Sequence, residues 1–158
     1  MKYNTLAIVQ ARFNSSRFPG KVLKEVGGIP LIQILFHRLS LAKNIDKIIL
    51  ATSDLIENDV LAQSIEDLGF DVFRGHDSDV LGRYDSAAKK YCSEKIVRIT
   101  GDCPMIDPEI VDDVINLYNK KHADYACNIE PPTFPDGLDT EVFSFISLEE
   151  AYQKAKNK

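Results

Sequence analysis

Apolar positions along the chain change repeatedly between two spacings, one typical of strands and one of helices. Strands are predicted at four short apolar runs: residues 6–9, 48–51, 72–73 and 96–100. Helices are predicted where apolar residues recur at helical spacing: about 30–43, 61–68, 80–91 and 108–118. Because strands and helices alternate, the pattern predicts an α/β layer fold with parallel strands joined by right-handed crossovers.

The pattern changes after residue 122. Residues 125–127 predict a strand, and the turn signal Asp136-Gly137 leads into a further strand over 142–145. A last helix is expected from Leu148. Two earlier helices carry N-cap signals, Ser78 or Asp79 for one and Asp107 followed by a proline for the other.

Ligands of open parallel sheets bind in the crevice outside the carboxyl ends of the strands. Two loops follow strands whose ends meet there, residues 10–28 after the first strand and 100–107 after the fourth. The first of these loops is long for a connection between a strand and a helix. We therefore expect the functional residues in these two loops.

Composition indicates how many domains the chain forms and which classes of binding partner it excludes. The 158 residues are 44% apolar and 27% charged, which suits one hydrophobic core and a single domain. The net charge of −5 argues against nucleic acid or an anionic membrane surface as the partner. The chain also shows neither a membrane-length apolar run nor an apolar signal-peptide core, and its three cysteines form no CxxC pair. We expect a soluble cytoplasmic protein with reduced thiols.

The first loop concentrates positive charge in an acidic protein. Arg12, Arg17 and Lys21 fall within ten residues, and Ser15 adds a hydroxyl donor. Guanidinium and ammonium groups with backbone N–H donors are suited to a polyphosphate. The loop lacks the P-loop and dinucleotide-binding glycine patterns. From spacing alone, a loop whose charges face water explains the pattern equally well.

Carboxylates follow the later strands. Asp102 comes directly after the fourth strand, where Gly101 and Pro104 favour a sharp turn, so its carboxylate is expected in the crevice. Mg²⁺ uses one or two such carboxylates together with water and phosphate oxygens, although a turn or capping role also fits Asp102. Asp139 and Glu141 would share a strand face and could bind sugar hydroxyls or assist with metal.

Four separated segments carry a resemblance to a known family. The first is Ala11-Arg12-x-x-Ser15-x-Arg17-x-Pro19-Gly20-Lys21-x-Leu23. The others are Asp79-Val80-Leu81-x-Arg83-Tyr84, Arg98-x-Thr100-Gly101-Asp102-Cys103-Pro104 and Pro135-Asp136-Gly137-Leu138-Asp139-Thr140-Glu141. In this order, over nearly the whole chain, they resemble the cytidylyltransferases that activate acidic sugars, and above all the branch named for spore coat polysaccharide biosynthesis.

The resemblance implies a three-layer α/β/α sandwich with a mixed, mainly parallel sheet, of the glycosyltransferase-A type found in nucleotide-diphospho-sugar transferases. It implies CTP as nucleotide, Mg²⁺ as cofactor and an acidic sugar or related acceptor. The residues that it places at the nucleotide are Ala11, Arg12, Ser15, Arg17, Lys21 and Arg83. For Arg83, an exposed position on the helix explains the sequence equally well. Arg12, Lys21 and Asp102 would be catalytic, with Asp102 also the metal ligand. Asp139 and Glu141 would bind the acceptor.

The reaction implied is transfer of CMP from CTP to an acceptor hydroxyl with loss of pyrophosphate, and no residue stands out as a general base. A further acidic segment of the related enzymes does not occur before Lys158, so we expect the domain to lack its C-terminal part. A non-catalytic nucleotide- or sugar-binding module is therefore the alternative. A glycosyltransferase is disfavoured because Asp102 is not part of an Asp-x-Asp motif. A homodimer through the first apolar helices is possible, although core packing explains them as well.

Overall fold

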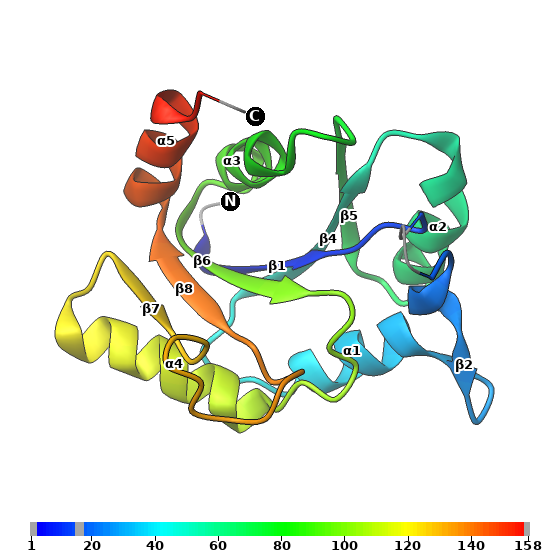
Figure 1. Cartoon of the computed structure of the whole chain (residues 1–158), viewed down its shortest axis with the longest axis horizontal. Coiled ribbons are helices and arrows are strands. Elements are labelled where there is room, and N and C mark those ends of the chain that lie inside the picture. The colour runs from blue at the N-terminus through cyan, green and yellow to red at the C-terminus, as the bar shows by residue number, and fades with distance from the viewer. Residues whose placement is uncertain (1–2, 15–17, 157–158) are drawn as a thin grey trace.

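A six-stranded sheet forms the centre of the computed structural model, which describes residues 3–14 and 18–156 (Figure 1). Across the sheet the strands are β5 (Asp71–Gly75), β4 (Lys47–Ser53), β1 (Tyr3–Gln10), β6 (Ser93–Thr100), β8 (Glu141–Ser144) and β7 (Tyr125–Cys127). The first four are parallel to one another, whereas β8 runs antiparallel to both β6 and β7. The predicted mixed, mainly parallel sheet is confirmed.

Helices cover both faces of this sheet, which confirms the expected three layers. Apolar residues of α1 (Leu31–Leu39), α2 (Asp59–Glu66) and α4 (Pro108–Lys121) belong to the core on one face. Those of α3 (Val80–Lys90) and α5 (Phe145–Lys154) belong to the core on the other face. None of the helices in the described part of the chain is long and apolar enough to cross a membrane.

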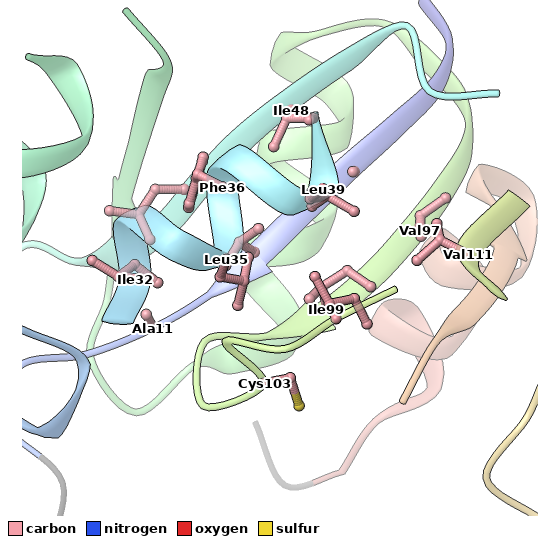
Figure 2. Close-up of a cluster of buried hydrophobic side chains, with 14 of the residues drawn as sticks. Ala11, Ile32, Leu35, Phe36, Leu39, Ile48, Val97, Ile99, Cys103 and Val111 are labelled. Atoms are coloured by element: carbon pink, nitrogen blue, oxygen red, sulfur yellow. The ribbon is translucent and has the colours of Figure 1, made fainter. Parts of the chain in front are cut away.

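The larger core cluster lies between the sheet and α1 and reaches the loops at the carboxyl ends of the strands (Figure 2). Leu35 and Phe36 of α1 are completely buried against it, so the apolar face of this helix is used in the core. Ala11 and Cys103 lie outside the strands, yet both are buried members of the same cluster. The core therefore anchors the two loops that follow β1 and β6.

Helix ends differ from their predicted positions where a neighbouring group captures backbone donors. The first helix ends at Leu39 and not near Lys43, because Asp112 of α4 accepts hydrogen bonds from the backbone N–H groups of Lys43 and Asn44. The last helix begins at Phe145, which was expected in a strand. Ser144 caps it by accepting a hydrogen bond from the backbone N–H of residue 147 at 2.9 Å. The N-caps Asp79 and Asp107 are confirmed.

A short hairpin before α1 was not predicted. Its strands are β2 (Glu25–Val26) and β3 (Ile29–Pro30), so Pro30 precedes the helix and does not open its first turn. The connecting residues, Gly27 and Gly28, have φ of 60° and 81°. Two successive residues with positive φ form the turn that matches the twist of a hairpin, which explains the glycine pair.

Candidate active site

The loop after β1 is closed by its own backbone and tied to the next strand. The backbone N–H of Gly20 donates to the carbonyl oxygen of Phe13 at 2.7 Å, and the left-handed φ of Gly20, 69°, turns the chain there. Asn58 is 2% exposed, and its Oδ1 accepts a hydrogen bond from the backbone N–H of Phe13 at 2.9 Å. Lys21 then opens a short 3-10 helix, η1 (Lys21–Leu23). These contacts fix where Lys21 leaves the loop.

The loop after β6 packs directly on the loop after β1. The backbone N–H of Gly101 donates to the carbonyl oxygen of Gln10 at 2.8 Å. A Cβ atom on Gly101 would lie 2.6 Å from the Cβ of Ala11, so no larger residue fits between the two loops. Asp102 follows, and its Oδ2 accepts a hydrogen bond from the Lys21 Nζ at 2.7 Å. Close backbone packing thus joins an ammonium group and a carboxylate that are 81 residues apart.

These groups line a cavity of about 300 Å³ at the carboxyl ends of β1 and β6. Its lining residues are Gln10, Ala11, Arg12, Asn14, Lys21, Val22, Arg98, Thr100, Gly101 and Asp102. Arg12, Lys21 and Asp102 therefore share one pocket, in the crevice that the sheet topology predicts. Ala11 lines it as a buried residue with 5% exposure.

The positive charge of Lys21 in this pocket is paired with the negative charge of Asp102. The hydrogen bond from Lys21 lowers the pKa of Asp102, although partial burial acts in the opposite direction. Asp102 is therefore ionised at neutral pH, and 48% of its side chain is exposed. An ammonium group has three N–H donors, so Lys21 can contact Asp102 and a phosphate oxygen at the same time.

Arg12 is held from the side by the loop after β5. Its Nη1 lies 3.1 Å and 3.2 Å from the two carboxylate oxygens of Asp77. Partial burial acts to raise the pKa of Asp77, but the hydrogen bond from Arg12 and the positive charges of Arg12 and Arg83 lower it overall. Among the described residues the pair uses Nη1 alone, which leaves the Nε and Nη2 edge of the Arg12 guanidinium for a ligand.

Arg83 is buried, with 2% exposure, so the interpretation as an exposed helical arginine is wrong. Its Nη1 donates to the carbonyl oxygens of His76 and Asp77 at 2.6 Å and 2.8 Å. It lines a neighbouring cavity and not the one that contains Arg12 and Asp102. Contact between Arg83 and a nucleotide stays a prediction. Ser15 and Arg17, also predicted at the nucleotide, lie outside the described residues.

Asp139 and Glu141 do not share a strand face, because β8 begins at Glu141 and Asp139 lies in the preceding loop. Glu141 pairs with Arg98, its neighbour on β6. Burial and the negative charges of Asp136, Glu141 and Asp102 raise the pKa of Asp139. The structure therefore places Asp139 within the electrostatic range of Asp102, while acceptor binding by Asp139 or Glu141 stays a prediction.

Sequence reasoning gave no role to three residues that shape this site. Arg98 lines the pocket, and its signal was a charged residue inside the apolar strand run 96–100. Asn58 and Asp77 follow the strands β4 and β5, whose loops carry no cationic cluster and were not singled out. Both act by fastening the loop after β1, a role that leaves no local sequence pattern.

A family model described as cytidylyltransferase matches residues 6–158. The chain belongs to the cytidylyltransferase family. It is 39% identical over 153 residues to an uncharacterized protein of Methanocaldococcus jannaschii, covering 97% of this chain and 62% of that protein. It is 35% identical over 159 residues to the spore coat polysaccharide biosynthesis protein SpsF of Bacillus subtilis, covering 94% of this chain and 66% of that protein. The chain thus spans just under two thirds of the length of both relatives.

Solved structures agree with this assignment. A cytidylyltransferase from Leptospira borgpetersenii superimposes with a TM-score of 0.92 at 32% identity, covering 97% of this chain and 65% of that chain. A CMP:2-keto-3-deoxy-manno-octonic acid synthetase complexed with CTP superimposes with a TM-score of 0.78, covering 98% of this chain and 79% of that chain. Its identity is 17%, so this second match supports the fold alone. The nucleotidyltransferase fold and the family expected from the four motifs are both confirmed.

Proposed function

We propose that this cytidylyltransferase-family chain transfers CMP from CTP to a hydroxyl group of an acidic sugar or a related acceptor, with release of pyrophosphate. The observation that carries the proposal is the meeting of Arg12, Lys21 and Asp102 around one pocket in a chain of this family. The name of the relative SpsF supports an acceptor used in surface polysaccharide, and that of the 3-deoxy-manno-octulosonate cytidylyltransferase of Geobacter sulfurreducens supports a sugar acceptor. We place the reaction in the cytoplasm.

In this reaction the acceptor oxygen forms a bond to the α-phosphorus, and the bond from that phosphorus to the bridging oxygen of the β-phosphate breaks. Pyrophosphate leaves, and the hydroxyl proton passes to solvent. Arg12 and Lys21 would bind the β- and γ-phosphates and stabilise the negative charge that accumulates on the leaving group. The acceptor would lie on the side of Asp102 and Glu141, where Arg98 is held by Glu141. Positioning and charge neutralisation are the main contributions of the protein.

The residues present fit Mg²⁺ as a ligand shared with the nucleotide. Mg²⁺ binds through one or two carboxylates and keeps water and phosphate oxygens in its remaining positions. Asp102 is ionised and half exposed, so its carboxylate would hold the ion. Among residues 3–14 and 18–156, no group of three His, Cys, Asp or Glu side chains could hold a metal by itself. Mg²⁺ bound at Asp102 would withdraw electron density from the phosphate oxygens.

The proposal is tested by measuring pyrophosphate release from CTP and Mg²⁺ with a panel of acidic sugars, including 3-deoxy-manno-octulosonate and N-acetylneuraminate. We expect release with at least one acceptor and at least a 100-fold loss in Lys21→Ala. Glu150→Gln is the matched control because it removes the Lys154–Glu150 ion pair on the exposed face of α5.

Calorimetry with CTP separates the alternatives. Binding of CTP without pyrophosphate release across the panel would favour a non-catalytic nucleotide-binding module. Failure to bind CTP would contradict both functions. Tighter binding of UTP or ATP than of CTP would contradict the choice of nucleotide.

A further inference from the structure

The connection between β5 and α3 faces the cationic loop through one carboxylate. Asp77 holds Arg12 by Nη1, while 41% of the Arg12 side chain remains exposed. A free arginine side chain loses much rotamer freedom when it binds a phosphate, and a partner that orders it beforehand reduces this cost. The contact would therefore favour phosphate binding by Arg12, in addition to the modest stability that an exposed ion pair contributes.

Arg83 supports this carboxylate from inside the protein. Its guanidinium donates to the carbonyl oxygens of both His76 and Asp77, so it fixes the backbone that carries the Asp77 side chain. A Cβ atom on Gly75 would lie 2.8 Å from the Arg83 Cγ, which shows how closely the loop wraps around the arginine. The single Nη1 nitrogen serves both carbonyls, and a lysine side chain is one bond shorter, so its ammonium group would lie farther from them.

The start of α3 fixes the position from which Arg83 extends. Asp79 caps the helix by accepting a hydrogen bond from the backbone N–H of Gly82 at 2.7 Å. A Cβ atom on Gly82 would lie 2.3 Å from the Asp79 Oδ2, so the capped turn has no room for a side chain there. The N-cap, Arg83 and the loop carbonyls thus form one rigid connection that ends at Asp77.

The negative charge of Asp77 also acts on both arginines. Burial and the nearby positive charge of Arg12 lower the pKa of Arg83, so the two guanidinium groups repel each other. Asp77 faces both, and its ionised carboxylate opposes this repulsion. Removing Asp77 would therefore remove one of the negative charges that offset this repulsion.

We infer that Asp77, held in place by Arg83, is a positioning residue that orients the Arg12 guanidinium toward the phosphates of the nucleotide. In this arrangement Arg83 acts through the loop and does not contact the ligand. The inference rests on the proposed function, because it concerns the binding of CTP in the same pocket. This role gives a function to the loop after β5, the third loop at the carboxyl ends of the parallel strands.

A double-mutant cycle tests it, with CTP binding measured by calorimetry in the presence of Mg²⁺. We expect Asp77→Ala to weaken CTP binding about 5- to 10-fold and Arg12→Ala to weaken it about 30-fold or more. Because Asp77 acts through Arg12, the double variant should bind CTP as Arg12→Ala does. Asp59→Ala is the matched control: it removes an aspartate from another exposed ion pair, with Arg74 at 2.6 Å, and should leave affinity unchanged.

The sign of the effect distinguishes positioning from competition. If Asp77 instead competes with phosphate for Arg12, Asp77→Ala will bind CTP more tightly, and that result overturns the inference. Additive losses in the double variant overturn it as well, because they show that Asp77 acts independently of Arg12. If the wild-type protein does not bind CTP, the proposed function fails and this inference fails with it.

Arg83→Lys provides the second arm. It keeps the charge but is one bond shorter and reaches the two carbonyls less well, so CTP binding should weaken several-fold in the wild-type background and remain unchanged in the Arg12→Ala background. A purely structural role would weaken binding equally in both backgrounds. The Asp77 cycle decides the inference even if the buried Arg83 position does not tolerate substitution.

Discussion

Two cavities meet at Arg98 and differ in almost every other property. The first, of about 300 Å³, is formed by loops at the carboxyl ends of β1 and β6 and contains Arg12, Lys21 and Asp102. The second, of about 450 Å³, lies among α3, α5, β7 and β8 and is lined mainly by apolar atoms of residues such as Leu81, Phe143 and Leu148. Arg98 lines both.

Size and apolar character alone would select the second cavity as the ligand site. A nucleoside triphosphate carries several negative charges, however, and it requires cations and N–H donors, which only the first of the two cavities brings together. The comparison shows that the groups suited to binding a nucleoside triphosphate lie in the loops at the strand ends, whereas the larger apolar cavity lies where helices pack on the sheet. Four substitutions test this difference between the two cavities.

Asp102→Asn should have the largest effect. We expect kcat/KM for pyrophosphate release to fall about 1,000-fold, or about 4 kcal/mol of transition-state stabilisation, because the neutral amide is a poor ligand for Mg²⁺. The free energy of unfolding should change by less than about 1 kcal/mol, since the Lys21–Asp102 pair is partly exposed. Steady-state kinetics and urea denaturation measure the two quantities.

The Lys47–Asp71 pair provides a matched control for that substitution. Its atoms are 2.9 Å apart and its side chains are 24% and 45% exposed, compared with 2.7 Å, 29% and 48% for Lys21–Asp102. Asp71→Asn lies at the start of β5, at the opposite end of the strands. An equal loss of kcat/KM in Asp71→Asn would show that the effect of Asp102 is not local to the polar pocket.

Leu148→Ala tests the apolar cavity. Leu148 is 4% exposed and packs in the core between α5 and the sheet, so we expect the free energy of unfolding to fall by about 2–3 kcal/mol. At a temperature where the variant is folded, KM for CTP should remain within about twofold of the wild-type value. Chemical denaturation and initial-rate kinetics provide the measurements. A large rise in this KM would assign the apolar cavity to nucleotide binding.

The repetitive part of the fold could be predicted from the sequence for a simple physical reason. Strands covered on both faces must be apolar throughout, and helices that cover them must show a stripe, so β1, β4 and β6 leave strong local signals. The position of Asp102 after β6 then followed from topology. The glycine pair of the β2–β3 hairpin was also a local signal, but it was overlooked.

The features that the sequence alone did not predict depend on contacts between residues that are distant along the chain. The end of α1 depends on Asp112 of α4, which is distant in sequence. Arg83 has the spacing of a helical surface residue, and only the wrapping of the 75–79 loop buries it. Asn58 and Asp77 act on the loop after β1 from the segments that follow β4 and β5, so neither could be recognised before these segments were placed together.

Glu141→Gln tests the ion pair that links the two cavities, since Glu141 lines the second and its partner Arg98 lines both. Glu141 pairs with Arg98. Burial alone would lower the pKa of Arg98, but interactions with Tyr84 and Glu141 raise it overall. Removing one partner of a half-buried pair should cost about 1–2 kcal/mol in the free energy of unfolding. We also expect the acceptor KM to rise several-fold with the CTP KM unchanged, measured by initial rates at varied acceptor concentration. A change confined to the CTP KM would contradict the placement of the acceptor.

Asp139→Asn should have the smallest effect, and its sign depends on pH. Burial and three neighbouring carboxylates raise the pKa of Asp139 in the folded state, so its ionised form opposes folding above that pKa. The variant should therefore be slightly more stable than the wild type at pH 7, by less than about 1 kcal/mol. The difference should shrink as the pH falls through the raised pKa and vanish below the ordinary value near 3.8, where Asp139 is protonated in both states. Urea denaturation at pH 7 and pH 3.5 measures it, and a variant less stable than the wild type at pH 7 would show that Asp139 makes a favourable ionic contact instead.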